Sequence, residues 1–196
     1  MPASETELEA LLLGCIQASA RVMQVLEAAR AADLPDWRLF AGALYQTVWN
    51  ALTGRPADFG INDYDLAYFD IDVSQEAQTH RRLQVLDRIP ADLRAKVEVI
   101  NQARVHVWFE TEFGRPYPAL AQTDDMLRQA LSTAHAVAVR LEADGRLTVA
   151  APFGLADIFN MVLRPNPELL SDPQSILAHE QKALDAQKRW PEITIV

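Results

Sequence analysis

The chain has 196 residues, of which 49% are hydrophobic and 23% charged, as is typical of a globular protein of one domain. Its 27 acidic residues against 18 Lys and Arg give a formal net charge of −9, which argues against a large basic surface for a long nucleic acid or an anionic membrane. A single cysteine, Cys15, excludes an internal disulfide. The N-terminus lacks the basic region of a signal peptide, and no apolar run approaches the roughly 20 residues of a membrane span. We therefore expect a cytoplasmic protein without a membrane partner.

Capping residues and apolar spacing predict a helix, a short strand and a second helix at the start of the chain. The first helix is expected over about residues 5–31, with Ser4 or Thr6 as its cap. The strand is expected over residues 37–41, and an amphipathic helix over residues 44–52 ends before a glycine.

A loop over residues 54–61 leads into the next predicted strand. Segment 62–70 is rich in aromatic and branched residues, which favour a strand. A helix over residues 74–89 follows, with Ser74 as its N-cap.

The stretch 96–109 alternates in polarity. Apolar side chains occupy most odd positions, interrupted by Asn101, and charged or amide side chains occupy most even positions. This alternation predicts one long strand, bulged near Asn101, with an apolar core face and a polar face. A hairpin at residues 101–103 is disfavoured, because no glycine supplies the positive φ that a tight turn requires.

The last third of the chain predicts a hairpin between helices. A helix over 123–130 precedes strands over 137–141 and 147–149, which are joined at Asp144-Gly145; a short helix up to Met161 and a last helix over about 173–189 follow. The fold class is therefore α+β, with a small mixed or antiparallel sheet flanked by helices. We expect a single domain over residues 1–196, with a core at about 35–110 and a C-terminal hairpin and helical part at about 120–196.

Asp63 and Asp65 are the strongest candidates for a functional site. They stand two residues apart in a predicted strand, so their side chains share one face. Two carboxylates that close repel each other by about 4 kcal/mol at an effective dielectric near 20, and a cation relieves that repulsion. Oxygen ligands suit Mg²⁺ or Mn²⁺. The alternative is a pair of solvated acids at the end of a strand.

Four segments in this order resemble a known superfamily. A Gly-Ala turn at the start of a helix, an Asp-x-Asp strand and two later blocks are similar to the DNA polymerase β-type nucleotidyltransferases, and within them to a small, mostly bacterial family of nucleotidyltransferase-like proteins. The resemblance covers about residues 35–190, and its segments are Gly42-Ala43, Asp63-Tyr64-Asp65, Asn101-Gln102-Ala103-Arg104 and Ala151-Pro152-Phe153-Gly154.

The resemblance implies a fold and a set of roles. Gly42 and Ala43 would hold the phosphates of a nucleoside triphosphate, as a glycine at a helix N-terminus favours an anion. Asp63 and Asp65 would bind two divalent metal ions, Mg²⁺ or Mn²⁺, together with a third carboxylate. Glu98 is preferred for that carboxylate, because Asp70 lies five residues after Asp65 and a regular strand turns it to the opposite face.

The sequence departs from the superfamily pattern at three points. Ala43 stands where Gly or Ser is usual, the separation between Gly42 and Asp63 is longer than usual, and Asn50 stands where family members often carry Asp. Arg104 is expected on the same face as Glu98, where it either binds a phosphate or pairs with Glu98. The cations of the last helix are expected on a solvated face, and they are Lys182, Lys188 and Arg189. The four tryptophans are expected in the core, and they are Trp37, Trp49, Trp108 and Trp190.

These observations favour a metal-dependent nucleotidyltransferase. The expected reaction is attack of an acceptor hydroxyl on a nucleoside triphosphate, which transfers the nucleoside monophosphate and releases pyrophosphate. Two alternatives stay open: a catalytically degenerate domain that binds a nucleotide or a protein partner, and a metal-dependent phosphohydrolase. The acidic balance argues against a large nucleic acid as the acceptor, and the sequence does not identify the nucleotide or the acceptor.

Overall fold

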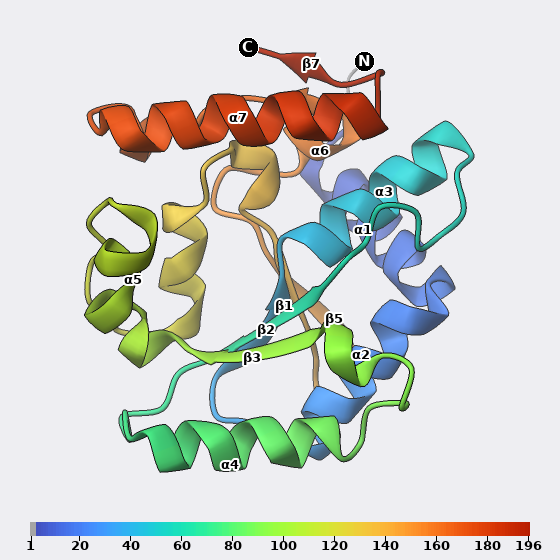
Figure 1. Ribbon diagram of the computed structural model, residues 1–196. Helices are drawn as coiled ribbons and strands as arrows, with labels where there is room; N and C mark the ends of the chain where they lie inside the picture. Colours follow the sequence, from blue (N-terminus) through green and yellow to red (C-terminus); the bar gives the residue numbers. More distant parts are fainter. Residues whose placement is uncertain (1–2) are drawn as a thin grey trace.

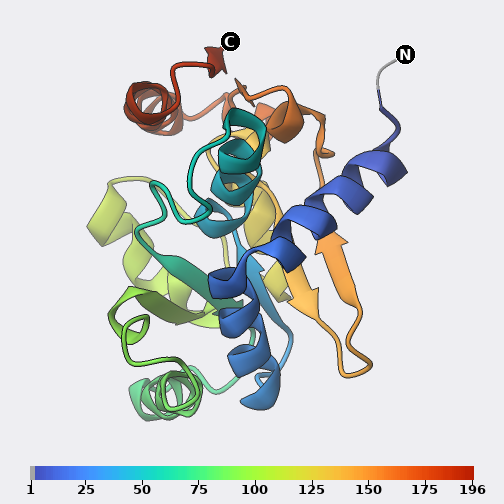
Figure 2. The ribbon, with the colours of Figure 1, turned by 90° about the vertical axis from the view of Figure 1, so that its right-hand side faces the viewer.

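The computed structural model describes residues 3–196. Its core is a five-stranded sheet in the order β3-β2-β1-β4-β5, flanked by helices on both faces (Figures 1 and 2). The strands are β1 (Trp37–Phe40), β2 (Tyr64–Tyr68), β3 (Val97–Asn101), β4 (Ala138–Leu141) and β5 (Leu147–Ala150), and a separate parallel pair joins β6 (Val162–Leu163) to β7 (Thr194–Ile195).

The sheet is mixed, as the sequence predicts. β2 runs parallel to β3, whereas β1 pairs antiparallel with both β2 and β4, and β4 with β5. The β4–β5 hairpin turns at Asp144 and Gly145, where Gly145 adopts a φ of +86° that is unfavourable for other residues. The α+β class is therefore confirmed.

Most of the helices form where capping residues and apolar spacing place them. Ser4 caps the first helix in a capping box with Glu7, and the Ser74 hydroxyl accepts a hydrogen bond from the Ala77 N–H at the start of α4. The helices are α1 (Glu5–Ala18), α2 (Ala20–Ala31), α3 (Gly42–Thr53), α4 (Gln75–Leu86), α5 (Val105–Phe113), α6 (Ala156–Phe159) and α7 (Pro173–Arg189).

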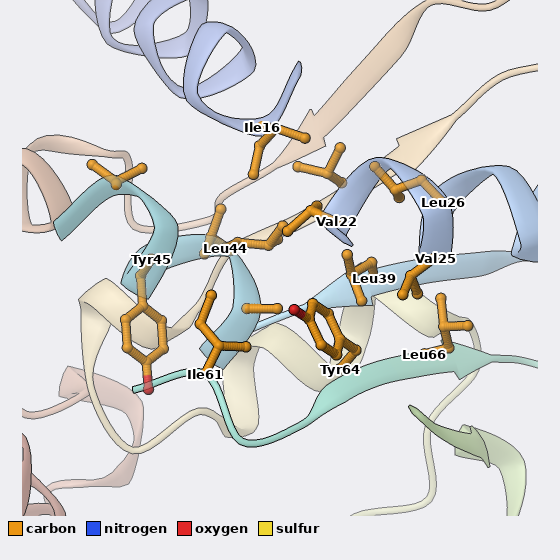
Figure 3. Packing of buried hydrophobic residues seen from close by; sticks show 14 of the residues in the cluster. Ile16, Val22, Val25, Leu26, Leu39, Leu44, Tyr45, Ile61, Tyr64 and Leu66 are labelled. Carbon is orange, nitrogen blue, oxygen red and sulfur yellow. The ribbon is translucent and has the colours of Figure 1, made fainter. Parts of the chain in front are cut away.

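The main core lies between the sheet and the N-terminal helices. Leu39 of β1 and Leu66 of β2 point from one face of the sheet toward Val25 of α2, and all three are fully buried (Figure 3). Burial of each such side chain stabilises the fold by about 1.5–3 kcal/mol. Figure 2 shows α1 and α2, in blue, on one side of the sheet and the lime segment that contains α5 on the other. The second face is therefore the one available for a site.

Two predicted elements are wrong. The helix expected over 5–31 is two helices that meet at 91°, because Ser19 ends α1 and its hydroxyl accepts a hydrogen bond from the Val22 N–H to begin α2. The long strand expected over 96–109 ends at Asn101, and a 3₁₀ turn and then α5 follow. The segment expected to be helical over 123–130 is helical, as a 3₁₀ helix over Thr123–Gln129.

Asn101 is the residue that turns the chain from strand to helix. Its side chain is fully buried; the Oδ1 atom accepts from the N–H groups of Ala103 and Asp70, and the Nδ2 atom donates to the carbonyls of Asp70 and Asp72. A β ladder beyond residue 101 would lose these bonds, and leaving a buried amide unpaired costs about 1–3 kcal/mol.

Within residues 3–196 no single helix is both long and apolar enough to cross a membrane; α1 and α2 reach the required length and composition only together, across the 91° bend.

Candidate functional site

The acidic residues lie where β2 begins. Asp65 of β2 and Glu98 of β3 are direct partners in the parallel register, and Asp63 immediately precedes β2. Burial, then Asp63, then Glu98 raise the pKa of Asp65 from 3.8 to about 7, and Lys182 opposes this shift. The structure therefore brings the three carboxylates close enough to repel one another.

The N-terminus of α3 lies beside these acids. A β-carbon added to Gly42 would lie 3.7 Å from the Asp63 Oδ1 atom and 3.4 Å from the Gln46 Nε2 atom. Within the described residues, the N–H groups of Gly42 and Ala43 have no hydrogen-bond acceptor, and no side chain caps the helix. Free amides and the helix dipole together favour an anion at this point.

The turn into α3 has an unusual backbone. Ala41 adopts φ +54° and ψ −118°, a region that residues with a β-carbon rarely occupy, whereas the φ of Gly42 is not positive. Strain of this kind costs about 1–3 kcal/mol and is often found at ligand sites. The sequence indicates the glycine of this turn, but the strained position is the alanine before it.

The structure separates the two candidates for the third carboxylate. Asp70 lies beyond the other end of β2, where it forms an ion pair with Arg81 of α4 at 3.2 Å. Glu98 stands directly opposite Asp65. Glu98 is therefore the acid that the fold places with the Asp pair.

Arg104 is not brought together with the acids. Its Nη1 atom donates to Gln75 Oε1 at 2.9 Å and Gln78 Oε1 at 3.3 Å, so its guanidinium is bound by two residues of α4. It forms no ion pair with Glu98, and the shared strand face predicted for the two residues does not exist, because β3 ends at residue 101. Phosphate binding by Arg104 stays a prediction without support from its position.

A cavity of about 440 Å³ begins at the acids and is lined by residues of the sheet, α5 and α7. Asp65, Glu98 and Lys182 of α7 are part of its wall, and the charge of Lys182 acts on Asp65. The aromatic side chains of α5 form another wall, among them Trp108, which is 38% exposed. Its volume is in the range of small-molecule sites, about 300–1,000 Å³.

Several residues of this cavity escaped the sequence analysis. Lys182 is exposed as predicted, but it also lies near Asp65 and lines the cavity. Trp108 is exposed in the cavity, whereas the other three tryptophans are buried as predicted. His135 and Arg115 also line it. Gly114, which ends α5 with φ +68°, was the signal for the helix that carries the aromatic wall.

The donor set at the acids fits a hard divalent cation. All three side chains offer oxygen, the type of ligand that Mg²⁺ and Mn²⁺ prefer, and their mutual repulsion is the kind that a cation relieves. As the side chains stand, no group of three or more Asp, Glu, His or Cys residues in the described part of the chain is placed to hold a metal ion. A divalent ion at the acids would therefore need further ligands, which the oxygens of substrate phosphates can supply.

Comparison with known proteins agrees with the fold. A solved NMR structure described as a CCA-adding enzyme head domain superposes with a TM-score of 0.77, covers 94% of each chain and is 22% identical, which supports a similar fold only. No curated protein matches this sequence. A family model described as nucleotidyltransferase matches residues 27–195, which is most of the chain. The protein is therefore a member of this nucleotidyltransferase family.

Proposed function

We propose that this protein transfers a nucleoside monophosphate from a nucleoside triphosphate to an acceptor hydroxyl and releases pyrophosphate. The observation that supports this most strongly is the placement of Asp63, Asp65 and Glu98 beside the uncapped N-terminus of α3. This placement supports the proposal, because phosphate binding and carboxylate chemistry would then meet at one point of the fold.

The phosphates would be held by groups on two sides. The N–H groups of Gly42 and Ala43 would donate to phosphate oxygens, and the ammonium group of Lys182 would lie across from them as a counter-charge. Asp63, Asp65 and Glu98 would hold divalent metal, whose chemistry is to neutralise charge on the phosphates and the reacting oxygens.

The transfer itself is a displacement at the α-phosphorus. The acceptor oxygen forms a bond to that phosphorus while the bond to the β-phosphate oxygen breaks, and pyrophosphate leaves with the electron pair. Glu98 is exposed at the edge of the cavity and accepts the proton of the acceptor hydroxyl, which then passes to solvent. Asp65 orients the reacting groups from its more buried position.

The test is calorimetric titration with ATP, GTP, CTP and UTP, each in Mg²⁺ and in EDTA. We expect binding of at least one nucleotide in Mg²⁺ only, and its loss in Asp65→Asn and Glu98→Gln. Asp70→Asn is the matched control at the other end of β2 and should bind normally. Lys182→Met should weaken binding, whereas Lys188→Met, which removes a cation paired with Asp185 on the same helix, should not. A folded wild-type protein that binds none of the four nucleotides would refute the proposal and favour a degenerate interaction domain.

A further inference from the structure

The far part of the cavity carries a cation that forms no direct ion pair. Arg115 is only 8% exposed, and within residues 3–196 its guanidinium forms no ion pair. Its hydrogen bond to Ser175 Oγ is long, at 3.4 Å. The charge of Asp172 acts on Arg115 without a direct ion pair, and the Asp172 carboxylate accepts hydrogen bonds from Gln174 and Ser175 at the start of α7.

Burial of this charge is unfavourable in the free protein. Removal of a guanidinium from water without an ionised partner is costly, and burial accordingly lowers the pKa of Arg115. The guanidinium lies 4.7 Å from the centre of the Phe109 ring, which compensates only part of the cost. An anion in the cavity would supply the missing partner and could accept two parallel hydrogen bonds.

The middle of the cavity fits an aromatic or apolar group. Phe109, Phe113 and Tyr117 surround it together with Trp108. His135 adds one polar group: it is 3% exposed, stacks on Tyr45 at 4.6 Å, and its Nε2 atom has no partner among the described residues. A buried nitrogen without a partner in a cavity is available to a ligand.

The cavity thus has a buried cation at one end, aromatic side chains in the middle and the acids at the other end. From these three regions we infer that the cavity binds the acceptor, and that the acceptor is a small organic anion with an aromatic or apolar body and a hydroxyl group. Its carboxylate or phosphate pairs with Arg115, its body lies against the α5 aromatics, and its hydroxyl reaches Asp65 and Glu98 at the other end. The identification of this occupant as the acceptor rests on the proposed function. A nucleobase is disfavoured as the occupant, since it is neutral and leaves the buried guanidinium without a counter-charge.

The test uses a fluorescent aromatic anion and its neutral analogue. 8-Anilinonaphthalene-1-sulfonate carries a sulfonate, and N-phenyl-1-naphthylamine has the same aromatic body without it. The folded wild-type protein should bind one sulfonate probe, and Arg115→Met should weaken that binding by about tenfold or more, because a charge-assisted pair is lost. The neutral probe should bind both proteins alike. Arg82→Met, which removes an exposed cation on α4, is the matched control.

Two further arms keep the inference separate from the proposed function. Arg115→Lys retains the charge and should keep part of the sulfonate binding. This variant carries the test if Arg115→Met proves unstable to heat. Asp65→Asn should abolish nucleotide binding but leave the sulfonate probe bound, so a failure of the nucleotide arm alone refutes the enzyme proposal and not the cavity.

Competition identifies the occupant. If the cavity receives the acceptor, the sulfonate probe and the magnesium complex of the nucleotide bind together. Displacement of the probe by the nucleotide would assign the cavity to the nucleobase and overturn the inference, as would equal loss of the charged and neutral probes in Arg115→Met or the absence of a stoichiometric probe site.

Discussion

Gly42→Ala should separate stability from function at the N-terminus of α3. The new β-carbon would lie 3.4 Å from Gln46 Nε2 and 3.7 Å from Asp63 Oδ1, which are ordinary contact distances. Because the φ of Gly42 is not positive, alanine fits the helix, and the loss of glycine's freedom in the unfolded chain should stabilise the protein by about 0.4–1 kcal/mol. The fold should therefore tolerate the change.

Nucleotide binding should respond in the opposite direction. The methyl group would stand between the free amides and Asp63, in the space that we assign to a phosphate, so the affinity for the nucleotide in Mg²⁺ should fall by at least about tenfold, or about 1.4 kcal/mol. Urea unfolding and calorimetry would measure the two effects on one preparation.

Gly14→Ala is the matched control for this experiment. Gly14 also lies in a helix, α1, with nothing within 4 Å of an added β-carbon. It should raise stability by up to about 1 kcal/mol and leave binding unchanged. If Gly42→Ala binds the nucleotide as tightly as the wild type, the phosphate site is not at the start of α3 and the reasoning fails.

Three other substitutions test the physical account of the fold. Asp65→Asn should stabilise the metal-free protein by up to about 4 kcal/mol at pH 8 and by little at pH 4. The reason is that the pKa of Asp65 is raised to about 7 in the folded protein, so its ionisation destabilises the fold as the pH rises from about 4 to 7. Urea titrations in EDTA at both pH values would show no such difference if the ionised Asp65 does not destabilise the fold. Asn50→Asp should destabilise the protein by about 3 kcal/mol or more, because the fully buried Asn50 Nδ2 atom donates to the carbonyls of Ala57 and Phe59 and a carboxylate cannot; an unchanged urea midpoint would contradict this. Ala41→Gly should stabilise by about 1 kcal/mol, since relief of a strained φ of about 1–3 kcal/mol exceeds the entropic cost of glycine of about 0.5–1 kcal/mol, and a fall in the melting temperature would count against strain at Ala41.

Local signals predicted those parts of the fold that local interactions determine. Ser4 and Ser74 cap helices because their hydroxyls reach backbone N–H groups three residues away. The Asp144-Gly145 turn defines the hairpin locally too, because the positive φ of Gly145 lets the chain reverse within two residues. The closeness of Asp63 and Asp65 could also be expected from their spacing, although β2 begins one residue after Asp63.

The two wrong elements have a common physical cause. At Ser19 and at Asn101 a short polar side chain bonds to nearby backbone and turns the chain, within segments whose apolar spacing suggested continuity. The alternation over 96–109 was ambiguous. Val105 and Phe109 both hold odd positions, which fits one face of a strand, but they are also four residues apart, which fits one turn of a helix. Tertiary bonds from Asn101 to the loop after β2 decide between the two periods, and a window of sequence does not contain them.

The turn of the chain at Asn101 also creates the cavity, which a continuous strand over residues 96–109 does not predict. A strand continuing to residue 109 would leave the acids on an open sheet edge, where a nucleotide could bind but nothing would select a small acceptor. Because the chain turns into α5 instead, the aromatic side chains that follow Glu98 by ten residues or more form a wall beside it, and Arg115, just after Gly114, enters that wall as a buried cation. Lys182 and His135 complete the site from elements that are distant in sequence. If the sheet carries the proposed transfer chemistry and the cavity beside it binds the proposed acceptor, acceptor specificity should follow changes in α5 and Arg115 rather than changes in the acidic strands.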